Sequence, residues 1–161
     1  MRFVDRIRHT VGREFFVSEP FEVTQAKVDA FAEATGDWDY MHNDPEWAAT
    51  HGPWGGTIAH GYYLVSLMAH FRGQAGFPTV ATADEMTVNY GLNKVRFLEP
   101  VLVGDRLRAR MRIAEMHERK PGRELVTTEV IYQTERRGDR PHMIAETLTL
   151  CVYGEAVAHA R

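Results

Sequence analysis

Residues 59–71 favour a helix whose side chains are apolar nearly all round, and this segment constrains the fold more than any other. The apolar positions are Tyr62, Tyr63, Leu64, Val65, Leu67, Met68 and Ala69. A helix that is apolar on every side must be buried over most of its surface. The rest of the chain is therefore predicted to wrap around this helix.

The second half of the chain supplies extended segments that can do so. Between residues 106 and 113 four apolar side chains alternate strictly with four arginines, the pattern of a strand with one face in water. Residues 137–140, Arg-Gly-Asp-Arg, predict a hairpin turn. Further strands are expected at residues 14–17, 86–90, 94–97, 124–135 and 143–153.

The first half contains shorter helices with recognisable ends. Thr24 is a candidate N-cap and Gly36 a candidate C-terminal end for one helix. Asp44 before Pro45 predicts a second helix that ends near residue 50, with a loop over residues 37–42 between the two. Helices early and long antiparallel strands late predict an α+β domain in which a sheet wraps a buried helix.

Length and composition narrow the function. The 161 residues suit a single domain over 1–161, and the one cysteine excludes an internal disulfide framework. A net charge of −3 gives no attraction to nucleic acid or to an anionic membrane, so neither is an expected partner. With no signal segment and no membrane-spanning run, the protein is expected to be soluble and cytoplasmic.

An acid and an imidazole lie five residues apart in the predicted loop, and a glycine follows near a helix start. Asp37 and His42 can share a water molecule and move protons near neutral pH. Gly61 offers a backbone N–H that can hold negative charge developing on a carbonyl oxygen. The residues favour addition of water to an activated carbonyl compound, or its loss.

The same stretches resemble a known family. Thr35-Gly36-Asp37, His42, Asp44-Pro45-Glu46, Ala48-Ala49 and Gly56-Thr57-Ile58-Ala59-His60-Gly61 are similar to the hydratase motif of the MaoC-like, (R)-specific enoyl-CoA hydratases. The segments 89–97, Asn-Tyr-Gly-Leu-Asn-Lys-Val-Arg-Phe, and 100–105 are similar to its nodulation-N-like branch. The resemblance covers roughly residues 12 to 153. Many hydratases carry Asn-Pro two residues after the catalytic acid, whereas this chain has Asp39-Tyr40.

The resemblance implies a hot dog fold, in which a curved antiparallel sheet wraps one long helix, and a homodimer. It implies that Asp37 and His42 are the catalytic pair and that Gly61 is the backbone donor to the thioester oxygen. The implied reaction adds water to trans-2-enoyl-CoA and gives (3R)-3-hydroxyacyl-CoA. The substrate is then an acyl-CoA thioester, and no cofactor or metal is expected.

Three further residues are candidates for contact with substrate: Tyr62 on the helix, Asn89 in a strand, and Arg96, which could meet the phosphates of coenzyme A. Two other functions stay open. One is an acyl-CoA thioesterase, because hot dog folds also host thioester hydrolysis, and the other is a non-catalytic acyl-thioester binding protein. A metal site at His42, Asp44, His51 and His60 is weakly supported, since their spacing matches no compact ligand set.

Overall fold

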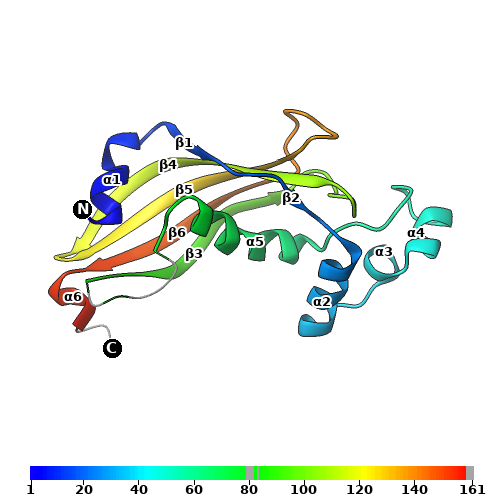
Figure 1. Ribbon diagram of the computed structural model, residues 1–161, viewed down its shortest axis with the longest axis horizontal. Helices are drawn as coiled ribbons and strands as arrows, with labels where there is room; N and C mark the ends of the chain where they lie inside the picture. The colour runs from blue at the N-terminus through cyan, green and yellow to red at the C-terminus, as the bar shows by residue number, and fades with distance from the viewer. Residues whose placement is uncertain (79–81, 83, 159–161) are drawn as a thin grey trace.

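The computed structural model describes residues 1–78, 82 and 84–158. The largest part of the structure is one antiparallel sheet (Figure 1). Its strands are β1 (Glu14–Val17), β2 (Phe21–Glu22), β3 (Glu85–Phe97), β4 (Arg106–Lys120), β5 (Arg123–Thr134) and β6 (Met143–Tyr153). Their order is β1-β4-β5-β6-β3, and β2 also pairs with β4. The long strand β3 is therefore an edge strand.

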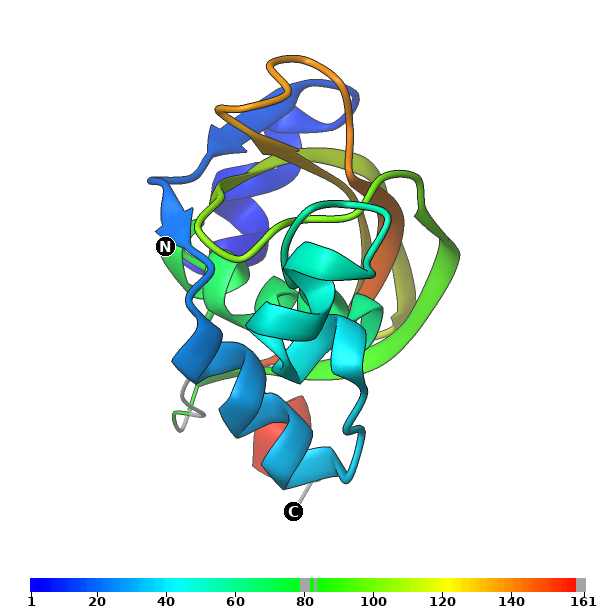
Figure 2. The same ribbon diagram turned by 90° about the vertical axis from the view of Figure 1, so that its right-hand side faces the viewer.

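The helices lie along the sheet and at its two ends. They are α1 (Phe3–Ile7), the 3-10 turn η1 (Arg8–Thr10), α2 (Gln25–Thr35), α3 (Tyr40–Asn43), α4 (Pro45–Thr50), α5 (Gly61–Gln74) and α6 (Glu155–Ala158). Seen from the end that carries α2, α3 and α4, the strands curve around α5 (Figure 2). The α+β arrangement of a curved antiparallel sheet around one long helix is confirmed.

Local sequence signals place the helix ends near the site. The Thr24 side chain accepts a hydrogen bond from the Lys27 N–H, and Gly36 ends α2 with φ of 74°, a left-handed conformation that glycine adopts without strain. Asp44 Oδ1 accepts from the Trp47 N–H at the start of α4. These predicted ends are confirmed, and they fix the position of residues 36–44 between two helices.

The alternation in β4 is also confirmed. Its apolar side chains, Leu107, Ala109, Met111 and Ile113, are buried beneath the helices. The four arginines of the alternating stretch, residues 106–112, lie on the outer face, where they pair with Glu14, Glu129 and Glu135. Because these arginines already have carboxylate partners, they form a solvated outer face of the sheet.

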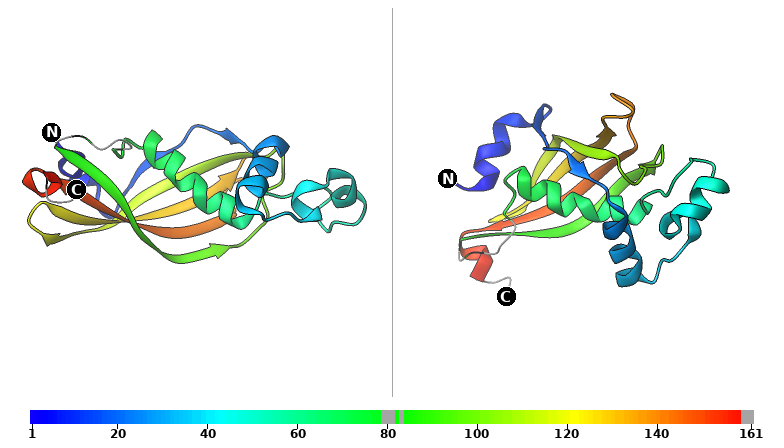
Figure 3. Two further views of the ribbon diagram at one scale, coloured as in Figure 1. Left: turned by 90° about the horizontal axis from the view of Figure 1, so that it is seen from below. Right: turned by 45° about the vertical axis from the view of Figure 1, so that its right-hand side comes forward.

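Helix α5 is less enclosed than the sequence predicted. The sheet covers the side that carries Tyr63, Leu64, Leu67 and Met68, but Tyr62 on the opposite side is 72% exposed. Figure 3 shows why, since α5 lies across one face of the sheet and none of the described elements forms a second layer over its other side. The expectation of burial on most sides is wrong for this outward face. No helix among the described residues is long and apolar enough to cross a bilayer.

The predicted loop over residues 37–42 contains the start of a short helix. Asp39 caps α3, because its Oδ1 accepts a hydrogen bond from the Met41 N–H at 2.9 Å. The two strands predicted at 86–90 and 94–97 are one strand, β3, interrupted by irregular pairing between Asn89 and Gly91 and between Asn93 and Arg96. A sequence pattern of period two is lost at such bulges, so the continuity of β3 was not visible.

Candidate active site

His42 lies at the end of α3, and one of its ring nitrogens is hydrogen-bonded to the backbone. Its Nδ1 lies 2.7 Å from the carbonyl oxygen of Ile58. A carbonyl only accepts, so Nδ1 carries the proton and, in the neutral ring, Nε2 carries the lone pair. This Nε2 makes no hydrogen bond within the described part of the chain. The arrangement therefore leaves a basic nitrogen available to a bound water or substrate.

His60 braces the loop that carries the predicted catalytic acid. It is fully buried, its ring stacks on that of His42 at 3.9 Å between centroids, and its Nε2 donates to the backbone carbonyl of Asp37 over 2.8 Å. Burial lowers the pKa of His60, which favours the neutral imidazole. His60 thus contacts both predicted catalytic residues and holds their segments together at the start of α5.

Gly61 is the first residue of α5, and no side chain caps this helix start. The Gly61 N–H makes no hydrogen bond in the described structure, as expected for the first turn of a helix. The sequence predicted this N–H as the backbone donor to the thioester oxygen. The structure fills the space of the missing side chain with the ring of Phe97, because a Cβ at residue 61 would lie 2.9 Å from it.

One cavity of about 290 Å³ brings His42 and Gly61 together. The residues Ile58, Ala59, Leu64, Phe97, Leu98, Glu99, Pro100 and Val101 also line it. Most of these side chains are apolar, which suits a site that must limit access of bulk water. The cavity thus combines a basic nitrogen, a helix N-terminus and an apolar wall.

The other predicted site residues do not line this cavity. Asp37 is exposed at the end of α2, and its carboxylate makes no hydrogen bond within the described residues. Tyr62 points outward from α5, and Arg96 is exposed near the end of β3, where its Nη1 donates to the Val95 carbonyl. Asn89 lies further along β3 and accepts a hydrogen bond from Arg72.

Sequence reasoning missed a residue that positions His42. The Gln25 side chain, in the first turn of α2, donates to the His42 carbonyl at 2.7 Å and accepts from the Thr57 hydroxyl at 2.6 Å. It also donates to Asp29, which in turn accepts from Asn43. One amide therefore ties α2, α3 and the segment before α5 together. The only indication of this clamp in the sequence is that Gln25 and Asp29 are polar and lie four residues apart, on one face of the helix.

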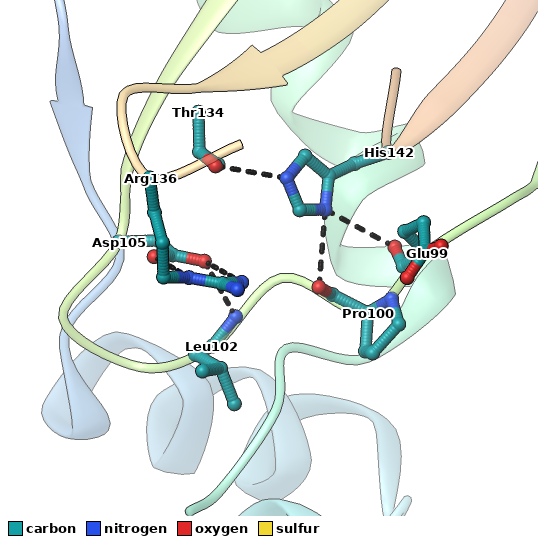
Figure 4. A network of polar contacts seen from close by, with 7 residues as sticks. All are labelled: Glu99, Pro100, Leu102, Asp105, Thr134, Arg136 and His142. Atoms are coloured by element: carbon teal, nitrogen blue, oxygen red, sulfur yellow. Dashed lines mark hydrogen bonds and ion pairs between the residues drawn. The ribbon is translucent and has the colours of Figure 1, made fainter. Parts of the chain in front are cut away.

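A second polar network holds the wall of the cavity (Figure 4). His142 is buried, its Nδ1 donates to the Pro100 carbonyl at 3.0 Å, and its Nε2 accepts from the Thr134 hydroxyl at 2.8 Å. Nearby, the Asp105 carboxylate accepts two hydrogen bonds from the Arg136 guanidinium. Asp105 also accepts from the Leu102 N–H. These contacts fix residues 99–105 against β5 and β6.

The residues of the weak metal hypothesis have separate local roles. Asp44 caps α4, His51 lies 2.7 Å from the Thr50 hydroxyl, and the two other histidines donate to backbone carbonyls. Within the described residues no group of three or more His, Cys, Asp or Glu side chains is arranged to hold a metal ion.

Known proteins share this sequence and fold. Residues 6–135 match the MaoC-like domain family. The chain is 38% identical over 140 residues to nodulation protein N of Rhizobium leguminosarum bv. viciae, covering 87% of this chain and 85% of that protein. It is 36% identical over 137 residues to 3-hydroxyacyl-thioester dehydratase Z of Mycobacterium tuberculosis, covering 85% and 87% of the two chains.

A solved structure adds to this result. The (R)-hydratase from A. caviae involved in PHA biosynthesis superposes with a TM-score of 0.65 at 26% identity, over 85% of this chain and 95% of that one. The family match spans most of the sequence, and two relatives exceed 30% identity over most of their length. The chain therefore belongs to the MaoC-like dehydratase family.

Proposed function

We propose that this protein is a hydratase that adds water to trans-2-enoyl-CoA thioesters and gives (3R)-3-hydroxyacyl-CoA, and that it also catalyses the reverse dehydration. The observation that carries the proposal is the single cavity that combines the available Nε2 of His42 with the unpaired N–H of Gly61. The dehydratase and (R)-hydratase names of two similar proteins support the same chemistry.

The start of α5 activates the thioester for attack by water. The thioester oxygen accepts a hydrogen bond from the Gly61 N–H, at the positive end of the α5 dipole. This oxygen gains negative charge as water attacks Cβ, so the donor stabilises the transition state more than the substrate. One such donor contributes about 2.7–4 kcal/mol to the barrier reduction.

His42 and Asp37 supply the proton transfers. In the hydration direction the water oxygen bonds to Cβ, a proton passes to His42 Nε2 or Asp37, and a proton is delivered to Cα. Because the Nδ1–H of His42 is hydrogen-bonded to the Ile58 carbonyl, its Nε2 is favoured as the acceptor of the proton. General acid and base catalysis of this kind contributes about 10²–10⁴-fold to the rate. Arg96, next to the cavity residue Phe97 in the chain, is a proposed contact for the phosphates of coenzyme A, and Tyr62, next to Gly61, is a proposed contact for the acyl part of the substrate.

The proposal includes a homodimer. β3 is an edge strand of 13 residues that pairs only with β6 among the described strands. It carries exposed Val88, Tyr90 and Leu92. A long apolar edge invites pairing with another strand, and a second copy of the same chain provides one by symmetry.

One assay tests the reaction and separates it from hydrolysis. Purified protein is incubated with crotonyl-CoA and with longer enoyl-CoA substrates, and the conjugated thioester absorbance and free thiol are followed together. Loss of absorbance without thiol, with a (3R) product by chiral analysis, supports the proposal. Release of thiol identifies a thioesterase instead, and a (3S) or mixed product contradicts the proposed placement of water.

A further inference from the structure

A buried arginine without a carboxylate partner lies in the last turns of α5. Arg72 is only 9% exposed. Its Nη1 donates to the Asn89 side-chain oxygen at 2.5 Å, while its Nε is buried without any hydrogen-bond partner in the described structure. No acidic side chain lies within ion-pair distance of it among the described residues. The centre of the Phe77 ring lies 5.0 Å from the guanidinium carbon and gives it a cation–π contact, but this does not replace a counter-charge. Because a buried charge is costly unless it is paired, the site favours binding of an anion.

A cavity of about 360 Å³ lies directly beside Arg72. Val65, Met68 and Arg72 line it from α5, and Asn89, Leu92 and Thr147 line it from the sheet. Leu92 pairs with Thr147 across β3 and β6, so both lie at the same level of the sheet beneath the helix. The cavity therefore has an apolar part near Val65 and a polar end at Arg72.

Hydroxyl groups on the sheet extend the polar end. The Oγ1 atoms of Thr128, Thr147 and Thr149 are all buried without a hydrogen-bond partner in the described residues. Thr147 pairs with Thr128 on β5, and Thr149 pairs with Asn89 on β3, so the three hydroxyl-bearing residues are neighbours. Native interiors rarely leave such groups unpaired unless a water, ion or ligand satisfies them.

The position of this cavity relates it to the proposed active site. Both cavities lie between α5 and β3, the first at Gly61 and Phe97 and the second from Val65 and Leu92 to Arg72. Gly61 and Arg72 are eleven residues apart on α5, about 16 Å along the helix axis. An acyl chain whose thioester is held at Gly61 and which runs along α5 therefore brings its far end to Arg72.

We propose that the enzyme selects medium-length acyl thioesters whose far end carries a carboxylate, and that Arg72 binds this carboxylate. The inference rests on the proposed hydration at Gly61 and His42. The planar guanidinium fork matches a carboxylate, and such charge-assisted bonds are the strong ones. Thr147 supplies an additional hydroxyl donor. An alkyl chain end offers nothing to these groups and leaves the charge buried and unpaired.

The test compares matched substrates. Enoyl-CoA thioesters of increasing length are prepared with either a terminal carboxylate or a terminal methyl ester, and kcat/KM is measured for each pair. At the length that reaches Arg72 we expect the carboxylate to be favoured about ten- to hundredfold, the range of one or two charge-assisted hydrogen bonds. Equal kcat/KM values for the carboxylate and the ester at every length, or a preference for the ester, would overturn the proposal regardless of the results with Arg72 variants.

Two substitutions assign the preference to the guanidinium. Arg72→Met keeps the volume and removes the charge, so the ratio of the two kcat/KM values is expected to fall below one, while Arg72→Lys retains part of the preference. Arg112→Met removes an arginine from the outer face of the sheet and serves as the matched control. An unchanged ratio in Arg72→Met contradicts the assignment. Dissociation of a dimer in Arg72→Met also contradicts it, because the guanidinium would then pair with a second copy.

A calorimetric titration separates this inference from the proposed reaction. If no enoyl thioester is hydrated at all, the proposed function is wrong. Ligand binding then still tests whether Arg72 binds a carboxylate. A free α,ω-dicarboxylate and its dimethyl ester, which carries no charge, are titrated into the wild type and into Arg72→Met. Tighter binding of the dicarboxylate that is lost in the variant supports the carboxylate site, and equal binding of both compounds overturns it.

Discussion

At the scale of single residues, hydrogen bonds to backbone carbonyls decide what each buried imidazole can do. His42, His60 and His142 each donate one ring N–H to a carbonyl oxygen, which fixes the neutral tautomer. The second nitrogen of His142 accepts from Thr134, and that of His60 is buried without a partner. His42 lines a cavity and keeps its second nitrogen available. It is therefore the histidine best placed for proton transfer.

The first prediction concerns the proposed acid and base. Asp37→Asn is expected to lower kcat by about 10²–10⁴-fold. Because the Asp37 side chain is exposed, the free energy of unfolding should change by less than about 0.5 kcal/mol. His42→Ala should lower kcat similarly but also cost stability, since it removes the stack on His60. Steady-state kinetics and urea unfolding measure the two effects. Glu33→Gln, on the exposed side of α2, is the control, and wild-type turnover in Asp37→Asn removes that residue from the mechanism.

The second prediction uses the close contact between Gly61 and Phe97. In Gly61→Ala the new Cβ would lie about 3 Å from three ring atoms of Phe97, so the ring must move. We expect lower kcat/KM and a loss of stability of no more than about 1 kcal/mol, the low end of overpacking, because Phe97 is 49% exposed and its ring can turn toward solvent. Phe97→Leu in the same chain should restore most of the stability, because it frees this space. If Gly61→Ala has the melting temperature and the turnover rate of the wild type, the Phe97 ring does not require a glycine at residue 61.

At the scale of elements, side-chain chemistry that acts locally could be predicted from the sequence. Thr24, Gly36 and Asp44 mark helix ends through hydrogen bonds to their own neighbours. In β4 the alternation of apolar and charged residues matches the alternation of buried and more exposed side chains. The exposed face of α5 could have been predicted from the polar residues Ser66, His70 and Gln74, which are spaced four residues apart on one side of the helix. The clamp by Gln25 could not be predicted, since its partners Thr57 and His42 come from other elements.

The third prediction is a pH dependence of stability from the network that joins β5, β6 and residues 99–105. Burial lowers the pKa of His142 in the folded protein from its ordinary value of 6.5. Below pH 6.5 the unfolded chain therefore binds a proton that the folded chain does not. The free energy of unfolding should be greatest above pH 6.5 and fall as the pH drops toward the folded-state pKa.

Urea unfolding at several pH values measures this slope. His142→Gln should flatten the part of the curve below pH 6.5, whereas His117→Gln, at an exposed position on β4, should leave it unchanged. His60 contributes in the same direction, because burial also lowers its pKa. A curve that stays level from pH 7.5 to pH 5 contradicts the assignment of a neutral, buried His142.

At the scale of the whole molecule, the sheet has two different edges. β1 and β2 continue one another along β4 at one edge, and the strands there are short. At the other edge β3 is long and carries exposed apolar side chains, and the outward face of α5 lies uncovered on the same side of the sheet. This edge is the surface on which the proposed second copy would pair. A two-fold related copy would extend the sheet across β3.

The fourth prediction is therefore a dimer formed through β3. Light scattering should give about twice the 18.4 kDa of one chain at micromolar concentration. Val88, 41% exposed on β3, is replaced by lysine, a residue that protects natural edge strands from pairing, and the dimer should weaken. Val11→Lys is the matched control, because Val11 is equally exposed but lies outside the sheet. A mass of one chain in the wild type contradicts the dimer, and an unchanged mass in Val88→Lys at every dilution contradicts pairing through this edge.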